Sequence, residues 1–252
     1  EKGIILGEIT KDLDSLPFPA RHLLPKKKVV SPAIWGTYGF EKGSPPATVM
    51  ITTRGCPYNC SFCANIPQPV RSHSPEYVVE EIKTIIENYD CRYISFVDDN
   101  FTLNRKRLLR MHDLFLPLKI GFRCQLRVDA VKEDILKILS EMGCKEIELG
   151  IETADNEILK LLNKNQTVEK AKEAIGHIKE HGLGVKAYVM AGLPGETWET
   201  IDRLKEFIRE TRPEKAPPAL FTPLPGCDVW KNPEKYGVKI LTKDFSKYFL
   251  RK

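Results

Sequence analysis

The chain has 252 residues, of which 42% are hydrophobic and 29% charged, with a formal net charge of +5. This composition is ordinary for a globular protein with a sizeable core, and the length suits one α/β barrel-type domain. No stretch approaches the roughly 18 consecutive apolar residues of a membrane span. Basic residues mostly stand beside acidic ones, and we interpret the compact basic run "PKKKVV" as a surface linker, so nucleic acid is not an expected partner.

The seven cysteines do not form a disulfide-like framework. Four of them (Cys91, Cys124, Cys144 and Cys227) are scattered, and the other three fall within eight positions. An odd number with one local group favours a reducing cytoplasm and a metal site over a secreted scaffold. The opening "EKGIILGEIT" has no initiator Met and no signal-peptide pattern. We therefore expect a cytoplasmic protein, of which this chain is a piece.

Residues 1–46 are rich in proline and lack periodicity, which predicts a linker or an extended segment. After them, strands alternate with helices. We predict strands at 47–53, 92–99, 120–128, 145–153, 184–192 and 218–224, and helices at 74–89, 105–116, 132–142, 157–163, 168–182 and 198–211. This alternation, at about 25 to 40 residues per unit, predicts a parallel sheet built from βαβ crossovers.

Several of these strands are polar on one face and apolar on the other. Strands buried on both faces are normally apolar throughout, so this alternation indicates helices on one side and a polar lumen on the other. It favours a partial (β/α)6 barrel of the TIM type over a doubly wound sheet, with the chemistry at the carboxyl ends of the strands. The polar set is Arg123, Gln125, Arg127, Glu146, Glu148, Glu152, Lys186 and Tyr188, and the apolar set is Phe122, Leu126, Ile147, Leu149, Ile151, Val185, Ala187 and Val189.

Cys56, Cys60 and Cys63 follow the first predicted strand at the spacing C-x3-C-x2-C. Thiolates suit either zinc or an iron–sulfur cluster. A structural zinc site needs a fourth ligand at short range, and His73, ten residues further on, is the nearest candidate. Three thiolates on a [4Fe–4S] cluster would leave one iron open for a substrate. The spacing alone leaves both metals open, and its place in a βα array favours the cluster.

The stretch "CPYNCSFC" resembles the signature loop of the radical S-adenosylmethionine (SAM) enzymes, and the resemblance extends over about residues 45–230. It implies a radical SAM core with a partial (β/α)6 barrel. It also implies a [4Fe–4S] cluster held by Cys56, Cys60 and Cys63, whose open iron binds the amino and carboxylate groups of SAM. The implied reaction is reductive cleavage of SAM to a 5′-deoxyadenosyl radical, with a one-electron donor such as flavodoxin or ferredoxin as partner.

The same resemblance assigns contacts with SAM on the first strands of the barrel. Phe62, just before the third cysteine, is expected to contact the adenine. Asp98, Asp99 and Asn100 occupy the place of acceptors for the methionine amino group, although acids in a βα loop also cap helices. Arg127 suits the SAM carboxylate. An ion pair of Arg127 with Glu148 or Glu152 inside the lumen is the alternative.

Further contacts are implied later in the chain. Glu152, in "ELGIET", resembles a residue near the SAM ribose. Gly192 and Gly195, in "YVMAGLPGET", resemble a stretch whose backbone runs along the adenosine, and glycine permits such close approach. By itself this stretch is also an ordinary strand–turn–helix connection. Cys227 departs from the family pattern, where Thr is common. It could donate hydrogen or bind a ligand, and we favour a buried free cysteine.

The flanking segments indicate a branch of the family. "DLDSLPFPARHLLP", "FVDDNFT", "ELGIET" and "TPLPG" together resemble the cobalamin-binding-domain-linked, class B methyltransferase-like enzymes. This implies cobalamin in the intact protein and methyl transfer to an unactivated carbon or to phosphorus. We expect residues 1–46 to be a linker after an N-terminal cobalamin-binding domain outside this sequence, 47–230 to be the radical SAM core, and 231–252 to begin a C-terminal extension.

Two other functions remain open from the sequence. One is a cobalamin-independent radical SAM methylthiotransferase, cyclase or ring-forming oxidoreductase. The other is a zinc-binding nucleic-acid module. The substrate is not identified by any motif.

Overall fold

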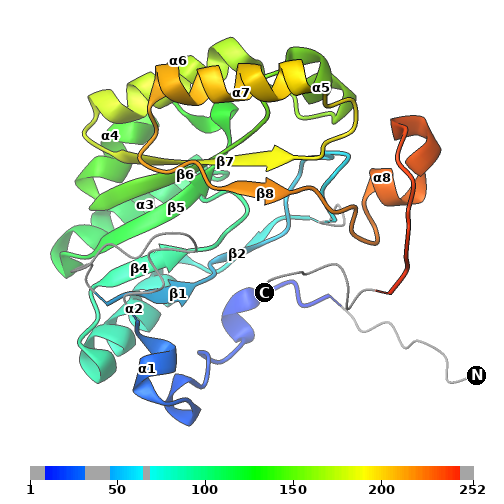
Figure 1. Cartoon of the computed structure of the whole chain (residues 1–252). Helices are drawn as coiled ribbons and strands as arrows, with labels where there is room; N and C mark the ends of the chain where they lie inside the picture. Colours follow the sequence, from blue (N-terminus) through cyan, green and yellow to red (C-terminus); the bar gives the residue numbers. More distant parts are fainter. Residues whose placement is uncertain (1–8, 32–45, 65–68, 245–252) are drawn as a thin grey trace, which may run out of the picture.

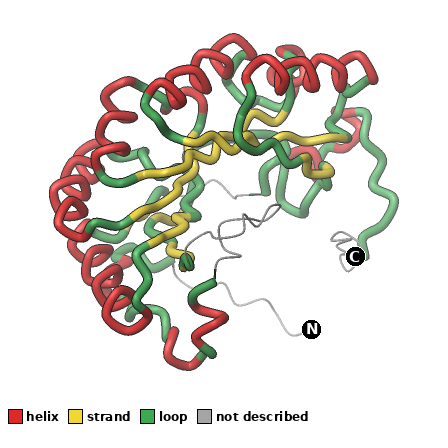
Figure 2. Tube along the Cα trace, turned by 60° about the vertical axis from the view of Figure 1, so that its left-hand side comes forward, coloured by secondary structure: helices red, strands yellow, loops and turns green. Residues whose placement is uncertain are grey.

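The computed structural model describes residues 9–31, 46–64 and 69–244. Six strands pair in parallel in the order β1-β4-β5-β6-β7-β8, and the sheet curls into a half barrel (Figure 2). The expected α/β partial barrel is therefore confirmed. The strands are β1 (Thr48–Met50), β4 (Tyr93–Phe96), β5 (Gly121–Leu126), β6 (Cys144–Glu152), β7 (Gly184–Ala191) and β8 (Pro218–Leu220).

Helices cover the convex outer face of the sheet (Figure 1). They are α2 (Pro75–Tyr89), α3 (Arg105–Phe115), α4 (Glu133–Glu141), α5 (Asn156–Leu161), α6 (Val168–Glu180) and α7 (Trp198–Thr211). Most begin at a side chain that accepts a hydrogen bond from a first-turn N–H; for α2, the cap is Ser74 and Pro75 is the first helical residue. At the end of α4, Gly143 takes φ +98°, a conformation that favours glycine.

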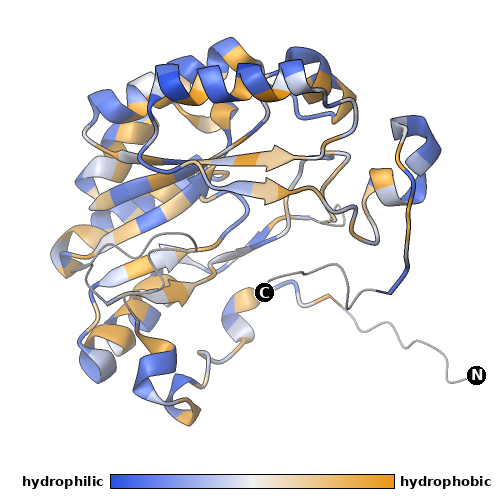
Figure 3. Ribbon diagram, viewed as in Figure 1, coloured by the Kyte–Doolittle hydropathy of each residue, from blue (hydrophilic) through white to orange (hydrophobic). Residues whose placement is uncertain are grey.

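The main hydrophobic core lies between the outer face of the sheet and these helices. Phe96, Phe101, Phe115 and Phe122 pack together at its centre; the Phe96 and Phe122 ring centroids are 5.4 Å apart, edge to face. Figure 3 shows the apolar strand segments and the polar outward surfaces of the helices. Burial of each such side chain contributes about 1.5–3 kcal/mol to stability.

The first predicted strand is shorter than expected. It ends at Met50, and the chain then enters β2 (Thr53–Arg54), which pairs antiparallel with β3 (Arg71–Ser72). The carboxylate of Asp98 explains the break, because it accepts hydrogen bonds from the Thr52 and Thr53 N–H groups at 2.6 and 2.5 Å. These two N–H groups therefore leave the sheet. The cysteine loop is thus an insertion between β2 and β3.

The described part of the N-terminal segment lies against α2 and does not hang free. It contains two 3-10 turns, Leu13–Ser15 and Arg21–Leu23, and the short helix α1 (Lys26–Val29). The carboxylate of Asp14 accepts a hydrogen bond from the Ser74 N–H at 3.0 Å. Arg21 forms a 2.6 Å ion pair with Glu81 of α2. Residues 1–8 and 32–45 of this expected linker lie outside the described residues.

The last described elements are α8 (Asp228–Lys231) and a 3-10 turn at Pro233–Tyr236. Two further turns, Leu116–Leu118 and Val128–Ala130, follow α3 and β5. Residues 245–252 of the expected C-terminal extension lie outside the described residues. In the described ranges, every helix is too short or too polar to cross a bilayer.

Candidate functional site

A cavity of about 360 Å³ opens on the concave side of the sheet, at the carboxyl ends of its strands. It brings together all three clustered cysteines and four of the other predicted site residues, Phe62, Asp99, Arg127 and Glu152. The remaining lining residues are Tyr58, Gln125, Leu126, Glu148, Gly150, Lys164, Tyr188, Val189, Met190 and Ala219. Residues from all six strands of the main sheet, or from the loops after them, therefore converge here, as expected for this fold.

The cysteine loop is held from two sides by hydrogen bonds to its backbone. The Ser61 N–H donates to the Leu162 carbonyl oxygen at 2.8 Å, and the Asn163 side-chain amide donates to the Asn59 carbonyl oxygen at 2.8 Å. On the other side, the Val229 N–H of α8 donates to the Ser61 carbonyl oxygen at 3.1 Å. The connection between α5 and α6, and helix α8, thus position the loop.

The three cysteines line the same cavity. Cys56 and Cys60 are half-buried and Cys63 is exposed. Burial raises the pKa of the Cys56 thiol in the metal-free protein. Within residues 9–31, 46–64 and 69–244, no three His, Cys, Asp or Glu side chains lie close enough to bind a single metal ion.

His73, the nearest candidate for a fourth zinc ligand, faces the N-terminal segment. Its Nδ1 lies 3.1 Å from the Asp14 carboxylate, and its ring stacks on Tyr77 with centroids 4.1 Å apart. It is not among the residues that line the cysteine cavity.

The Arg127 guanidinium donates from all three of its nitrogens. Nε donates to the Asp129 carboxylate at 2.9 Å, Nη2 to the Lys164 carbonyl oxygen at 2.9 Å, and Nη1 to the Cys60 sulfur at 3.6 Å. Burial lowers the pKa of Arg127, but the hydrogen bond and charge of Asp129 outweigh this and raise it. The alternative of an ion pair with Glu148 or Glu152 is wrong, because the nearby Asp129 takes that place.

Glu152 is paired with Lys164, which the connection between α5 and α6 supplies. Lys164 Nζ donates to Glu152 Oε1 at 2.5 Å, and both side chains line the cavity. Glu152 has φ +66°, a left-handed conformation that is rare for a residue other than glycine. A local shift in the register of β6 against β7, between Gly150 and Glu152, accompanies this backbone turn.

The polar face of the central strands forms a buried ionic network at one side of the cavity. Lys186 Nζ lies 2.9 Å from Glu148 Oε1 and 3.2 Å from the Tyr188 hydroxyl, and Arg123 Nη1 lies 3.3 Å from the same Glu148 oxygen. Buried charges need such partners. Burial, followed by the charge of Glu148, raises the pKa of Tyr188. The predicted polar lumen is therefore partly neutralised by its own side chains.

Three polar residues, Asp98, Asp99 and Asn100, follow β4, and only the second of them lines the cavity. Asp99 lines the cavity. Asp98 is fully buried and accepts hydrogen bonds from the N–H and hydroxyl groups of Thr52 and Thr53; burial nevertheless raises its pKa. Asn100 is also buried, and its side-chain oxygen accepts from the Thr102 N–H at 3.3 Å.

Helix capping does not explain these acids. The residue that caps α3 is Asn104, whose side-chain oxygen accepts from the Arg107 N–H at 3.0 Å. The alternative interpretation of Asp98 and Asp99 as helix caps is therefore wrong. Asp98 instead holds the carboxyl end of β4 against the start of the cysteine loop.

Phe62 and the glycine-rich stretch meet through an apolar cluster of Ile158, Leu162 and Leu193, on which Phe62 packs. Gly192 and Gly195 have φ +82° and +81°, so both positions favour glycine. They are not among the lining residues; they turn the chain so that Leu193 lies behind Phe62. The stretch does connect β7 to α7, as the plainer interpretation held.

Cys227 is a buried free cysteine, as favoured from the sequence; only 1% of it is exposed. Its sulfur accepts the Trp230 N–H at 3.3 Å and thereby caps α8. It therefore supports the helix that holds the cysteine loop.

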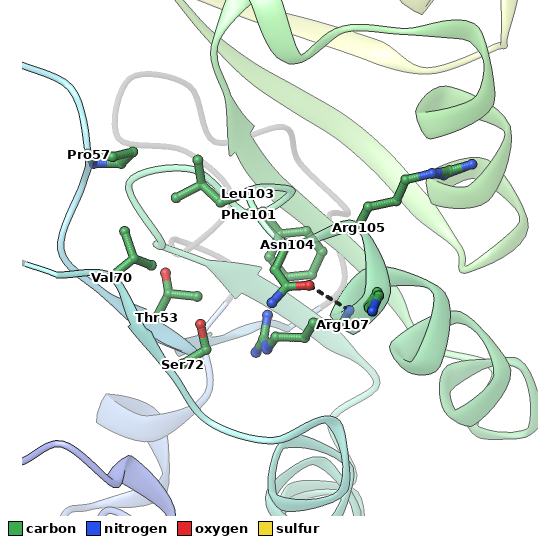
Figure 4. Close-up of a pocket in the computed structure, with 10 residues that line it drawn as sticks. Thr53, Pro57, Val70, Ser72, Phe101, Leu103, Asn104, Arg105 and Arg107 are labelled. Atoms are coloured by element: carbon green, nitrogen blue, oxygen red, sulfur yellow. Dashed lines mark hydrogen bonds between the residues drawn. The ribbon is translucent and has the colours of Figure 1, made fainter.

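A second cavity, of about 470 Å³, shares no lining residue with the first (Figure 4). It lies between β2, β3 and the first turn of α3. Its lining residues are Thr53, Pro57, Val70, Ser72, Phe101, Leu103, Asn104, Arg105, Lys106 and Arg107. None of the predicted site residues is among them.

Three contributors to the site were not predicted from the sequence: Tyr58, Asn163 and Lys164. Tyr58 stacks beneath Arg127, with the guanidinium carbon 3.7 Å from the ring centroid. Asn163 and Lys164 belong to a loop that is near the cysteines only in the folded chain. The one available signal was the "NKN" triplet between two helices, because Asn tolerates left-handed backbone; Asn163 and Asn165 have φ +53° and +50°.

Comparison with known proteins gives relatives that include methyltransferases and cyclases. An uncharacterized methyltransferase of Pyrococcus horikoshii is 31% identical over 98% of this chain and 53% of its own length. An anaerobic magnesium-protoporphyrin IX monomethyl ester cyclase of Rubrivivax gelatinosus is 28% identical over 85% of this chain and 39% of its own. The chain thus spans about half or less of the length of these curated relatives.

Solved structures share the fold. The methyltransferase TsrM of Kitasatospora setae, with cobalamin and a [4Fe–4S] cluster bound, superposes with a TM-score of 0.63 at 18% identity, covering 78% of this chain and 44% of that one. OxsB, a cobalamin-dependent SAM radical enzyme with aqua-cobalamin and SAM bound, gives a TM-score of 0.64 at 18% identity, covering 79% and 37%.

The family model that matches this sequence covers residues 50–208, which include the cysteine loop and the strands from β4 to β7. Members of this family are enzymes that use a [4Fe–4S] cluster and SAM. The match covers most of the chain, so this protein belongs to the radical SAM superfamily.

Proposed function

We propose that this chain is the catalytic core of a cobalamin-dependent radical SAM methyltransferase that acts on an unactivated carbon or on phosphorus. The observation that carries the proposal is the convergence of three cysteines with Phe62 and Glu152 on one cavity of the half barrel. The methyltransferase of Pyrococcus horikoshii, aligned with nearly the whole chain, supports the reaction class.

The arrangement of the thiols fits a [4Fe–4S] cluster held by Cys56, Cys60 and Cys63. In such a cluster each thiolate binds a different iron, so the sulfurs stay apart while facing a common space. The three cysteines line one cavity. A structural zinc site needs a fourth ligand, and His73, the candidate from the sequence, is not among the lining residues. The residues at this cavity therefore support the cluster over zinc.

The other lining residues fit the parts of SAM. The apolar ring of Phe62, backed by Ile158 and Leu193, would contact the adenine. Glu152 would accept from the ribose hydroxyls, and Asp99 from the methionine amino group. Asp98, Asn100, Gly192 and Gly195 act behind these contacts, since they shape the loops that carry them. We leave Arg127 out of the SAM contacts, because Nε, Nη1 and Nη2 are each engaged by a group of this chain, one of them the Cys60 sulfur.

When bound, the cluster supplies the electron that cleaves SAM to a 5′-deoxyadenosyl radical. The residues of this chain orient the cluster ligands relative to the residues proposed to contact SAM. The loop hydrogen bonds of Ser61 and Asn163 fix the thiols relative to β6, on which Glu152 lies.

In this proposal, cobalamin binds to a part of the protein outside this sequence, and the electron donor is a separate protein. The described residues 9–31 lead into the core, in line with a linker from an N-terminal cobalamin-binding domain, with the core over 47–230 and an extension beyond it. A flavodoxin- or ferredoxin-type protein would supply the electron. Two structural neighbours, TsrM and OxsB, contain cobalamin, which favours this branch.

One second candidate has an observation in its favour. The magnesium-protoporphyrin ester cyclase, 28% identical over 85% of the chain, indicates a radical SAM ring-forming enzyme. The two candidates share the cluster, SAM and the cavity, and they differ in whether a methyl group reaches the product. Mass spectrometry of the product made with methyl-deuterated SAM separates them.

The test begins with anaerobic reconstitution. We expect about four irons and four sulfides per chain, a broad visible absorbance, and release of 5′-deoxyadenosine when dithionite and SAM are added. Cys56→Ala, Cys60→Ala and Cys63→Ala should each lose this release. Cys91→Ala is the matched control, because Cys91 is buried beside β1 and donates to the Pro46 carbonyl oxygen. One zinc and no iron in the wild type would refute the proposal.

A further inference from the structure

Arg127 makes a polar contact with one of the clustered cysteines. Its Nη1 lies 3.6 Å from the Cys60 sulfur, within the range of an N–H···S hydrogen bond. A cationic donor therefore lies directly on one of the three proposed cluster ligands.

The guanidinium cannot easily turn away from this thiol. Nη2 donates to the Lys164 carbonyl oxygen and Nε to the Asp129 carboxylate, each at 2.9 Å. The Tyr58 ring, two residues from Cys60, lies flat against it at 3.7 Å. The planar guanidinium thus has a contact at each of its three nitrogens and the Tyr58 ring on one face, so it keeps a single orientation.

The contact is also largely removed from solvent. Only 6% of Arg127 is exposed. Screening by water and salt is weak at such a position, so a full positive charge there acts strongly on a neighbouring sulfur. Asp129 offsets part of this charge, and its side chain is 39% exposed, so water screens the carboxylate more than the cation.

Hydrogen bonds to the cysteine sulfurs and nearby charge are known to set the reduction potential of iron–sulfur clusters. Reduction by one electron makes the cysteine-bound group more negative. A cation that donates to one of the thiolates favours the more negative state. The effect on the potential is therefore upward.

We propose that Arg127 is a positioning residue that holds the Cys60 thiolate and raises the reduction potential of the cluster, in place of binding the SAM carboxylate. This inference rests on the proposed function, because it requires a cluster at the three cysteines. It assigns Arg127 a role before SAM binds, in accepting the single electron from the donor protein.

The experiment is a dithionite redox titration of the reconstituted protein, followed by electron paramagnetic resonance in the absence of SAM. In Arg127→Gln, we expect the ratio of reduced to oxidised cluster at a fixed potential to fall about tenfold, which corresponds to about 59 mV for one electron. Arg127→Lys keeps the positive charge but loses the forked donor geometry of the guanidinium. Its ratio of reduced to oxidised cluster should therefore lie between those of the wild type and Arg127→Gln. Iron content is measured in parallel.

Two further variants make the outcome decisive. Arg107→Gln is the matched control, since Arg107 also donates to backbone oxygens, of His73 and Thr52, but not to a thiol; its potential should stay at the wild-type value. Asp129→Asn removes the offsetting carboxylate and should move the potential upward. The role of Arg127 itself is decided by Arg127→Gln, or by Arg127→Lys if the Gln variant fails to hold iron.

The failures are distinguishable. A wild-type protein that binds no cluster refutes the proposed function. A wild-type cluster with unchanged potential in Arg127→Gln refutes the role of Arg127 and leaves the proposed function intact. A weaker affinity for SAM in Arg127→Gln, at unchanged potential, would restore its assignment to the SAM carboxylate.

Discussion

Lys164 and Glu152 form an ion pair, 2.5 Å from Nζ to Oε1, against the backbone of Gly150 on the wall of the cysteine cavity. A methyl group on Gly150 would lie 2.7 Å from the Glu152 oxygen and 2.9 Å from the Lys164 nitrogen. Both are the ends of flexible side chains. The ion pair in this geometry therefore requires glycine at position 150. The backbone conformation at this position does not require glycine.

Gly150→Ala should displace this ion pair without unfolding the protein. If Glu152 contacts the SAM ribose, we expect affinity for SAM to fall about tenfold, or about 1.4 kcal/mol. Equilibrium dialysis with the reconstituted protein measures this. Gly176→Ala is the control: a methyl group in that helical position meets nothing within 4 Å, and should stabilise α6 by about 0.5–1 kcal/mol. Unchanged SAM affinity in Gly150→Ala would contradict the role of Glu152.

The hydrogen bond from Asn163 to the Asn59 carbonyl oxygen ties the cysteine loop to the connection between α5 and α6. Asn163→Ala removes it and places alanine at φ +53°. We expect a loss of about 1–2 kcal/mol in unfolding free energy and less iron retained during gel filtration. Asn165→Ala, at φ +50°, changes the backbone preference alone. Equal iron retention in the two variants would exclude a role for the Asn163 side chain.

The buried pair of Lys186 and Glu148 should be strongly coupled. Each is 2% exposed, so Lys186→Met leaves a buried carboxylate without its 2.9 Å ion-pair partner, with Arg123 and Tyr188 still beside it. We expect a loss of about 3 kcal/mol in urea unfolding. The double variant Lys186→Met/Glu148→Gln should lose less than the sum of the single variants. Lys172→Met, from an exposed pair with Glu210, should lose under about 1 kcal/mol. Additive losses at 186 and 148 would contradict the coupling.

The attachment of the N-terminal segment to α2 should depend on pH through Asp14. Burial alone raises the pKa of Asp14, but hydrogen bonds from Ser74 and His73 lower it below 3.8. The folded state thus favours the carboxylate. Its contribution to stability is fully present above about pH 4, and it is lost as the pH falls through the lowered pKa.

Asp14→Asn should therefore remove a contribution to the unfolding free energy that depends on pH. The difference in unfolding free energy between the wild type and this variant should be larger at about pH 6 than at about pH 3.5. Urea unfolding at both pH values measures it. Asp12→Asn is the neighbouring control, since the Asp12 carboxylate accepts within its own turn, from the Asp14 N–H. An equal difference at both pH values would show that the charge of Asp14 does not hold the segment.

Much of the fold could be predicted because it follows from local patterns. The polar and apolar faces of β5, β6 and β7 alternate along the sequence, and Ser74 and Pro75 mark a helix start by themselves. The break after Met50 could not be predicted. It depends on the Asp98 carboxylate, which lies 45 or more residues away in the chain and takes two N–H groups out of the sheet.

The candidate site shows the same division. The spacing of Cys56, Cys60 and Cys63, together with Phe62, is local and identified the family. The contacts that hold these residues come from Arg127, Asn163 and Lys164, which reach the loop only when the sheet curls. From the sequence, Arg127 was assigned to the SAM carboxylate, with an ion pair to Glu148 or Glu152 as the alternative. Nothing local indicated that Asp129 would accept from its Nε.

The sequence by itself determined the order of elements, the half-barrel class and the three thiols, because each depends on residues that are neighbours in the chain. Only the tertiary structure decided which charge faces which. The Arg127 guanidinium donates to the Cys60 sulfur, Lys164 pairs with Glu152, and Lys186 pairs with Glu148. Buried charges must find partners, and a curled sheet brings many into reach. The choice among them depends on distances that no local pattern encodes.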